Sequence, residues 1–331
     1  FYQYFYELFP NFQKKNSKIM KVNKSSLDFV SLAALDLSSM LIYPAFIFGL
    51  FTFLMTIFCN VLIIAVIAFS KNLQKPMFVL LVNLLIGDII ALIAFFPQFL
   101  ISIVTQNRLI TYNACLTQAF FVHFYGCTNI FTLSAMAYDR FIAICAPLRY
   151  NAIMTPQKVI QFIFWIWFIG FAMMFSLFML LAGFKICRNN IVDLYCNNPS
   201  IMKLICNNTT VNNYYGLFVL VVGLGGSNIV VIYTYAQILF TCIKTNQVDA
   251  WHKAIQTCGT HLVTFLLLQT FTMFSLVAHR IQNAPASLRK ILGVSVLIFP
   301  PILDPIIYGL KVQELRLNIV RFLKKRLGST K

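Results

Sequence analysis

The stretch "SAMAYDRFIAICAPLRY", residues 134–150, places an acid and a base side by side in a run of apolar and small residues. Charged side chains are costly both in a hydrocarbon layer and in a protein core, so Asp139 and Arg140 need an environment that accounts for them. Similar apolar segments lie on both sides of this stretch. The length and spacing of these segments decide the fold class.

The composition is that of a membrane protein, because 60% of the 331 residues are hydrophobic and only 11% are charged. About 20 apolar residues are enough to span a hydrocarbon core of about 30 Å. Seven runs of this length lie between short polar breaks, at residues 43–69, 77–104, 112–145, 159–184, 214–243, 255–278 and 288–310. The sequence therefore predicts an all-α membrane protein, a seven-transmembrane helix bundle with a short amphipathic C-terminal helix.

The polar breaks are too short to hold a second folded domain. We expect residues 1–42 to form an extracellular N-terminal tail, 43–310 the seven-transmembrane domain, and 311–331 a cytosolic amphipathic helix and tail. In the last segment, apolar residues recur at helical spacing among basic ones, which is typical of a helix that lies on an anionic lipid surface. The net charge of +17 is spread over loops and tails, which favours membrane lipid over nucleic acid as a partner.

The distribution of Lys and Arg favours an N-terminus outside the cell. In that orientation 14 of the 26 basic residues lie on the cytosolic side and 12 outside, five of them in the N-terminal tail. Translation from Met20 would remove three of those five, and we expect Met20 to be the natural start. The predicted location is the plasma membrane, as a multi-pass protein.

Four cysteines lie on the predicted outer side, namely Cys115, Cys187, Cys196 and Cys206. Glycosylation sequons lie on the same side, at Asn23, Asn207 and Asn208. Both features are typical of an oxidising compartment, and spacing alone leaves three possible pairings for four cysteines. From Cys115 to Arg140 is about 37 Å of helix, which places the two charges at the inner rim. There they act either as a switch or as a snorkelling anchor.

Four segments carry a family resemblance, in the same order along the chain. They are "KPMFVLLVNLLIGDI" (75–89), "MAYDRFIAICAPLRY" (136–150), "KAIQTCGTHL" (253–262) and "PPILDPIIYGLKVQELR" (300–316). They resemble the olfactory (odorant) receptors within the rhodopsin-like, class A G-protein-coupled receptors, over about residues 40–320. The segment "NNTTVNNYYGL" (207–217) resembles receptors of fish type.

The resemblance implies a function and a set of residues for it. A small-molecule odorant would bind in the outer half of the bundle and activate a heterotrimeric G protein of the stimulatory olfactory type, which raises cAMP. It implies the disulfide pairs Cys115–Cys196 and Cys187–Cys206. Asp139, Arg140 and Tyr308 are the expected residues of the G-protein switch, and no enzyme activity is implied.

A polar cluster is expected in the bundle interior, formed by Asn60, Asp88, Asn129 and Asp304. The family's usual Asn before the last proline is Asp304 here, and its usual Tyr after Arg140 is Phe141. With two acids the cluster would share a proton or bind a cation such as sodium near Asp88 and Asp304. The alternative is a static hydrogen-bonded network.

The expected ligand site lies on one stripe of the third span, where residues recur at three- and four-residue steps. Its members are Val122, His123, Gly126, Cys127 and Ile130. In the sixth span Gln269 lies at a similar depth, so it faces either ligand or a neighbouring helix. Mostly apolar walls with few polar groups suit a small neutral or weakly anionic molecule.

Other classes of protein lack their characteristic residues here. Retinal-binding opsins need a lysine where this chain has Ile298, and amine receptors an aspartate where it has Val122. A transporter would show internal repeats, and an enzyme a nucleophile with its base or clustered metal ligands, so no cofactor or metal is expected apart from the cation. A non-olfactory class A receptor remains the main alternative, and a membrane transporter a more distant one.

Overall fold

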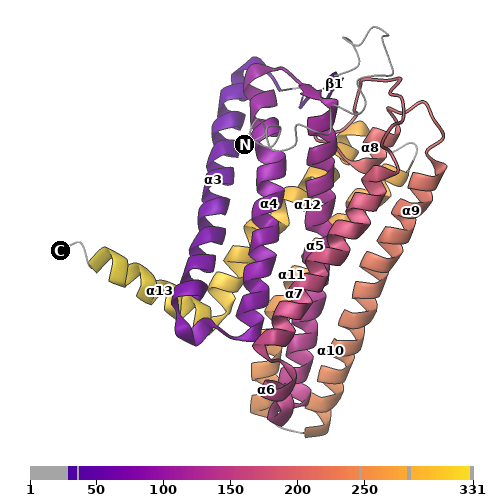
Figure 1. The fold of residues 1–331 in the computed structure, drawn as a ribbon. Helices are drawn as coiled ribbons and strands as arrows, with labels where there is room; N and C mark the ends of the chain where they lie inside the picture. The colour runs from indigo at the N-terminus through magenta and orange to yellow at the C-terminus, as the bar shows by residue number, and fades with distance from the viewer. Residues whose placement is uncertain (1–28, 36, 246–247, 282–284, 329–331) are drawn as a thin grey trace.

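The computed structural model describes residues 29–35, 37–245, 248–281 and 285–328, and its long helices run side by side in an elongated bundle (Figure 1). These helices are α3 (Ser39–Phe69), α4 (Pro76–Thr105), α5 (Tyr112–Cys145), α7 (Pro156–Met179), α9 (Thr210–Leu220) continued by η3 (Val221–Gly225) and α10 (Gly226–Thr245), α11 (Val248–Arg280) and α12 (Ala286–Lys311). Within the described residues, six helices are long and apolar enough to cross a membrane. A seventh is added when α5 and the bent turn after it count as one span. The predicted fold class is confirmed.

Helix boundaries follow local signals that hydropathy does not register. Pro76 and Pro156 begin α4 and α7, where proline suits the first turn because its missing N–H would have no partner there. Helix α7 ends at Met179, short of the expected Phe184. Gly183 has φ of 85°, in the left-handed region, and the buried Leu181 belongs to the turn that follows the helix. The apolar run therefore continues into a loop.

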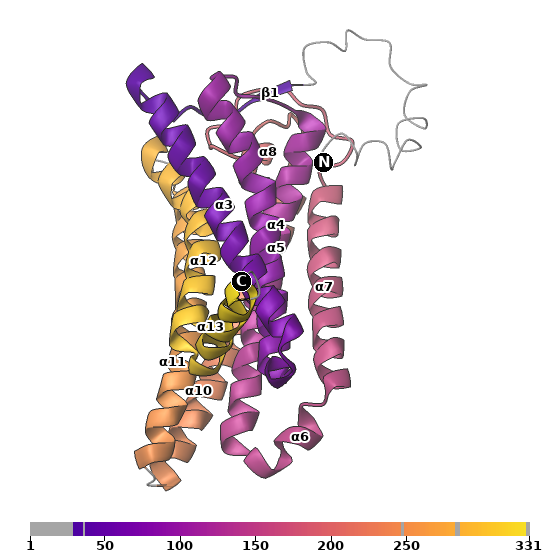
Figure 2. The ribbon, with the colours of Figure 1, turned by 90° about the vertical axis from the view of Figure 1, so that its left-hand side faces the viewer.

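Small elements gather at one end of the bundle, which we call the disulfide end (Figures 1 and 2). There β1 (Phe29–Ser31) pairs antiparallel with β2 (Leu109–Thr111), with Val30 opposite Ile110, and α8 (Asn198–Met202) lies in the loop after α7. The segment expected to be a tail thus contributes a strand, and α3 begins at Ser39, before the expected start of the domain.

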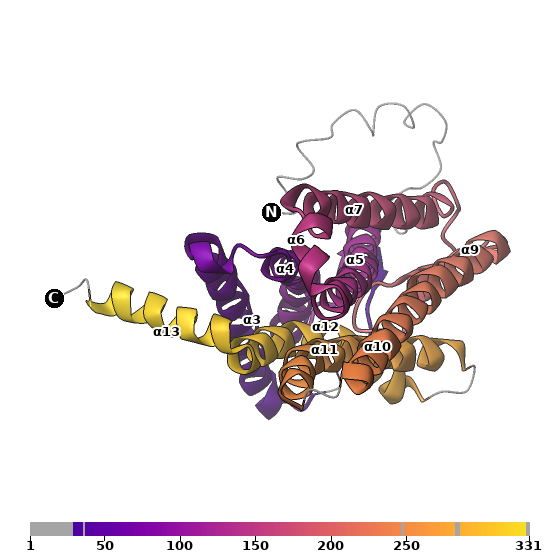
Figure 3. The ribbon, with the colours of Figure 1, turned by 90° about the horizontal axis from the view of Figure 1, so that it is seen from below.

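The opposite end, which we call the α13 end, holds η1 (Lys71–Leu73), η2 (Pro147–Arg149), α6 (Tyr150–Ile153) and α13 (Gln313–Gly328). Figure 3 shows α13 running away from the bundle. An ion pair joins its Glu314 to Lys75 at 2.6 Å, and its Phe322 stacks on Phe69 with ring centres 6.3 Å apart. The predicted C-terminal helix is present.

Helix α5 is the central element of the bundle, since it packs against α4, α7, α10 and α11. Its contact with α4 is especially close at Gly87, where a Cβ atom would lie 1.9 Å from Oδ1 of Asn129. Because α5 runs from the disulfide end to the α13 end, it connects any site at one end with a site at the other.

Candidate functional site

A cavity of about 170 Å³ lies between the helices in the half nearest the disulfide end. Its walls come from α5, α7, α8, α9, η3, α11, α12 and the loop before α8. The structure brings all five predicted residues of α5 to its wall: Val122, His123, Gly126, Cys127 and Ile130. The volume is below the 300–1,000 Å³ that is typical of sites for drug-sized ligands, so the cavity suits a smaller molecule.

Gln269 does not line this cavity. The wall residues of α11 are Thr272, Ser275, Leu276 and His279, a stripe at three- and four-residue steps. That stripe continues inward through the buried Leu268, and Gln269 is rotated about 100° from Leu268 around the helix. Of the two expected positions of Gln269, against ligand or against a neighbouring helix, its burial away from the cavity wall agrees with the second. The Oε1 atom of Gln269 is buried with no hydrogen-bond partner in the described part of the chain.

Several cavity residues come from the loop between α7 and α9, which contains none of the predicted ligand-site residues. Tyr195, Asn197 and Asn198 all line the cavity. They flank Cys196, whose disulfide to Cys115 fixes the loop across the end of α5. The position of these residues directly beside a cysteine tied to α5 is the signal that could have identified them.

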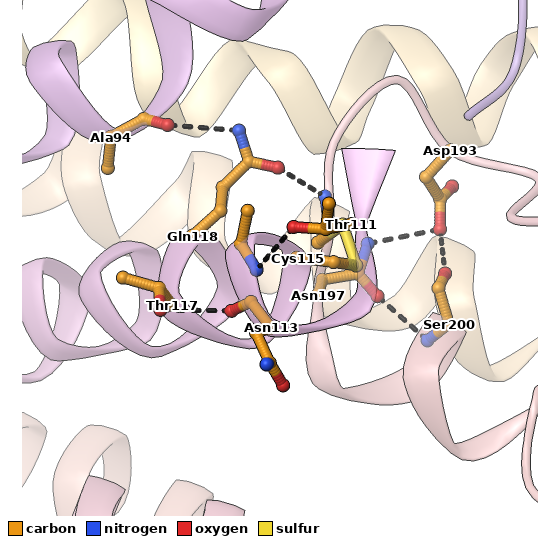
Figure 4. The surroundings of a disulfide bond; sticks show 11 residues. Ala94, Thr111, Asn113, Cys115, Thr117, Gln118, Asp193, Asn197 and Ser200 are labelled. Carbon is orange, nitrogen blue, oxygen red and sulfur yellow. Dashed lines mark hydrogen bonds between the residues drawn. A yellow bond between two sulfur atoms is a disulfide. The ribbon is translucent and has the colours of Figure 1, made fainter. Parts of the chain in front are cut away.

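Both disulfides that the resemblance implies are present, with Cα atoms 5.3 Å apart in Cys115–Cys196 and 5.4 Å apart in Cys187–Cys206. Figure 4 shows Gln118, one turn along α5 from Cys115, between two other elements. Its Nε2 donates to the carbonyl oxygen of Ala94 at 2.9 Å, and its Oε1 accepts from the backbone N–H of Cys196 at 2.9 Å. The loop is therefore held to α5 by a covalent bond and a buried amide.

The same loop reaches α11 through a buried carboxylate. Asp193 Oδ2 lies 3.3 Å from Nε2 of His279. It also accepts hydrogen bonds from Asn197 Nδ2 at 3.0 Å and from the hydroxyl of Ser200, which Figure 4 shows. Burial raises the pKa of Asp193, but the hydrogen bonds and charge of His279, with those of Ser200 and Asn197, outweigh burial and lower it to about 2. The Nδ1 atom of His279 lies 2.6 Å from the carbonyl oxygen of Ser275. Both ring nitrogens therefore face acceptors, an arrangement that the protonated ring satisfies.

His123 presents a different polar group to the cavity. Its Nδ1 lies 2.8 Å from the carbonyl oxygen of Ala119, which can only accept, so Nδ1 carries a proton. Its ring meets the edge of Phe178 with centres 5.7 Å apart. The cavity walls in the described part of the chain contain no Asp or Glu to balance a second proton. The neutral ring then offers Nε2 as a hydrogen-bond acceptor.

The four residues of the expected polar cluster lie buried between α3, α4, α5 and α12. Asn129 Nδ2 donates to Asp88 Oδ1 at 2.9 Å, and Asn60 Nδ2 donates to the carbonyl oxygen of Pro301 at 3.1 Å. Asp304 is 4% exposed and interacts electrostatically with Asp88. Three oxygens have no hydrogen-bond partner in the described chain: Asn60 Oδ1, Asp88 Oδ2 and Asn129 Oδ1. Unpaired buried oxygens beside two acids fit a cation, since hard cations prefer oxygen ligands.

At the α13 end, Asp139 and Arg140 pair with each other. Arg140 donates from Nε at 3.0 Å and from Nη2 to one oxygen of Asp139, whose other oxygen accepts from the hydroxyl of Tyr150 at 2.8 Å. Tyr308 is fully buried, and its hydroxyl lies 3.0 Å from Oγ1 of Thr264 on α11. In this structure Tyr308 of α12 is therefore in contact with α11, and Arg140 is paired with Asp139.

His261, which is not among the predicted site residues, holds α11 to its neighbours. His261 Nε2 lies 2.9 Å from the carbonyl oxygen of Leu133 on α5, and its Nδ1 lies 2.9 Å from the hydroxyl of Tyr235 on α10. With Thr264 and Tyr308, this contact fixes the α13 half of α11 against the bundle.

The comparisons with known proteins agree on one family. The family model described as olfactory receptor matches residues 49–326. Human olfactory receptor 52B2 is 35% identical over 78% of this chain and 80% of its own length, and human olfactory receptor 6C70 is 33% identical over 90% and 95%. Squid rhodopsin has the same fold, with a TM-score of 0.70 at 15% identity over 91% of this chain and 92% of its own.

The chain belongs to the olfactory receptor family. The resemblance carried by the four segments is confirmed, and the alternatives of a non-olfactory class A receptor and of a transporter are set aside. The receptor is an odorant-sensing G-protein-coupled receptor and a multi-pass membrane protein, and it is not an enzyme. Its partners are an odorant ligand and a G protein.

Of the three predicted glycosylation sites of the receptor, the structure describes two. Asn207 and Asn208 are both exposed beside Cys206, and Asn208 Oδ1 accepts from the backbone N–H of Thr210 at 2.9 Å. Asn23 and the expected start at Met20 lie outside the described residues. The loop sequons are therefore accessible at the disulfide end.

Proposed function

We propose that this receptor binds a small odorant in the cavity at the disulfide end and activates a G protein of the stimulatory olfactory type, which raises cAMP. The observation that carries the proposal is that one helix, α11, contributes both to the cavity wall and to the contacts near the α13 end. Ser275 and His279 of α11 line the cavity, while His261 and Thr264 of the same helix contact α5 and α12. A ligand that contacts α11 more favourably in one position than in another shifts the balance between the two positions.

The proposed activation step opens the α13 end. An outward movement of α11 breaks the contacts of His261 with Leu133 and of Thr264 with Tyr308, which makes room for the G protein. Arg140 then leaves Asp139 and contacts the inserted G-protein helix or the released Tyr308. The ligand can drive this change only by its difference in affinity for the two states, and a difference of about 5.5 kcal/mol turns a 1:99 equilibrium into 99:1.

In the proposed topology the disulfide end and the N-terminus are extracellular and the receptor resides in the plasma membrane. Two disulfides and two exposed sequons at one end support this orientation, because disulfides form and glycans are attached to sequons in the secretory pathway. The α13 end is then cytosolic, and the basic residues of α13 lie on the anionic inner leaflet, in agreement with a lipid-binding amphipathic helix. A sodium ion among Asn60, Asp88, Asn129 and Asp304 is part of the proposal, supported by the three unpaired oxygens there.

The test is a cAMP assay in cells that supply the olfactory G protein, with surface expression of the receptor verified. We expect at least one small odorant from a broad panel to raise cAMP. Arg140→Ala is the matched control, since it leaves the cavity intact and should abolish the response while ligand binding persists. If the verified surface receptor gives no cAMP signal with any odorant, or if Arg140→Ala signals normally, the proposed coupling is wrong.

A further inference from the structure

Two glycines of the cavity wall face empty space. Gly126 lies on α5 and Gly223 lies in η3, and both line the cavity. Apart from the adjoining residues and the backbone of its own helical turn, a Cβ atom built at either position finds no atom within 4 Å. A methyl group at either position would therefore occupy the cavity and would not displace a neighbouring side chain.

Neither position needs glycine for packing or for backbone conformation. At Gly170 a Cβ would lie 2.9 Å from Cγ2 of Thr128, and at Gly49 it would lie 2.9 Å from Cδ2 of Leu100, so these glycines allow close helix contacts. Among the described glycines, Gly183 alone has a positive φ. Glycine weakens a helix relative to alanine, and at Gly126 and Gly223 its structural effect is confined to the space it leaves open.

The two glycines lie where other features of the wall also point to a ligand. Gly126 belongs to the α5 stripe between His123 and Ile130. Gly223 lies in a π-helical turn, a feature that occurs often at functional sites, and this turn brings both Gly223 and Leu224 to the wall. The side chain of Asn198 lines the same cavity, is 5% exposed, and has an Oδ1 atom without a hydrogen-bond partner in the described chain.

We propose that Gly126 and Gly223 set the maximum length of the ligand, which is an unbranched molecule with an apolar chain and one uncharged polar end, of the class of the primary alcohols. This proposal rests on the proposed function, because it takes the cavity as the ligand site. The apolar chain extends into the space that the missing side chains leave. One methylene more or less in an apolar pocket changes affinity by roughly 10–200-fold, so a methyl group on the wall is sufficient to exclude the longest ligand.

The experiment measures binding directly, through the thermal unfolding midpoint of the purified full-length receptor with straight-chain primary alcohols from butanol to dodecanol. Ligand binding raises the midpoint according to affinity. In Gly126→Ala and in Gly223→Ala we expect the longest stabilising alcohol to be shorter by one or two carbons and its affinity to fall at least tenfold, while the short alcohols bind as before. The matched control is Gly225→Ala, since Gly225 also lies in η3 with open space beside it but does not line the cavity.

Three results would overturn the proposal. The first is a length limit that stays unchanged in both variants or shifts equally in Gly225→Ala. The second is a loss of binding of all alcohols together, including the short ones. The third is a wild-type receptor that binds none of the series. Alanine favours helix more than glycine does, so the variants are expected to fold, and their unliganded midpoints check this. Because the measurement needs no G protein, a failure of the proposed coupling would leave these binding results intact and would be recognised separately.

Discussion

His123 is the residue whose chemistry is most clearly defined by the structure. Its Nδ1 donates to the carbonyl oxygen of Ala119, so Nε2 is available to accept a hydrogen bond from a donor in the cavity. We predict that His123→Phe, which keeps a ring but removes the acceptor, lowers the potency of an alcohol agonist by about tenfold, the equivalent of one hydrogen bond of about 1.4 kcal/mol. Dose–response curves of cAMP would measure this shift.

The control for His123 is a ligand that lacks the donor. A methyl ether with the same number of heavy atoms as the alcohol should lose little or no potency in His123→Phe. Equal losses for alcohol and ether would show that the substitution changes the shape of the cavity, and would contradict the acceptor role.

At the polar cluster, the unpaired oxygens predict a stabilising effect of sodium. The purified receptor should unfold at a higher temperature in sodium chloride than in choline chloride at equal ionic strength, because a cation bound to the folded state alone stabilises it. Asp88→Asn removes one negative charge from the site and should abolish the difference. The interpretation fails if the sodium effect persists undiminished in that variant.

The sequence could predict single residues where side-chain direction follows from periodicity. Five residues of α5 recur at helical steps counted from Arg140, and this spacing predicts the stripe that lines the cavity. Depth and polarity predict that Gln269 faces the interior, and it is 8% exposed, but they do not separate ligand contact from contact with a neighbouring helix, and Gln269 is not part of the cavity wall. Asp193 and His279 could not be paired from sequence, since their contact depends on the path of a loop that has no periodicity.

At the level of elements, the loop between α7 and α9 is joined to α11 by Asp193. The pKa of Asp193 is lowered in the folded receptor, which means that folding favours the charged carboxylate. The stabilising effect of this charge is therefore present above the ordinary pKa of 3.8 and is lost as pH falls toward about 2. We predict that Asp193→Asn lowers the unfolding midpoint of the purified receptor at pH 7, and that wild type and variant converge as pH falls from 4 to 2.

Ser200→Ala serves as a comparison for Asp193→Asn, because it removes one donor to the carboxylate and keeps the charge. It should produce a smaller loss of stability with the same pH dependence. A difference between wild type and Asp193→Asn that is the same at pH 7 and pH 2 would refute the electrostatic explanation.

Long elements were predictable and short ones were not, for a physical reason. The thickness of the membrane requires a run of about 20 apolar residues in each spanning helix, so the spans can be located in the sequence. The strands "FVS" and "LIT" have three residues each, too few for any period, and they form because their partner is held nearby. The apolar residues after Met179 look like helix in sequence but pack in a turn.

For the whole molecule, glycosylation tests the orientation. The exposed Asn207 and Asn208 lie at the disulfide end, and oligosaccharides are attached only in the lumen of the secretory pathway. We predict that the double variant Asn207→Gln, Asn208→Gln migrates faster than the wild type before, but not after, treatment with an endoglycosidase. Wild-type receptor without glycan at this loop, despite surface expression, would contradict the orientation.

The strand β1 has a consequence for biosynthesis. Val30 pairs with Ile110, and Ser31 donates its N–H to the carbonyl oxygen of Asn189 at 2.6 Å, so its second partner is made roughly 160 residues later. At about 5–20 residues per second, ribosomes need roughly 8–30 s to deliver that partner. During this interval β1 can pair with β2, but the backbone groups of Ser31 that bond to the loop after α7 remain unpaired. The first described residues of the receptor thus reach their final contacts only after four of the long helices have been made, and chaperones have that interval in which to bind them.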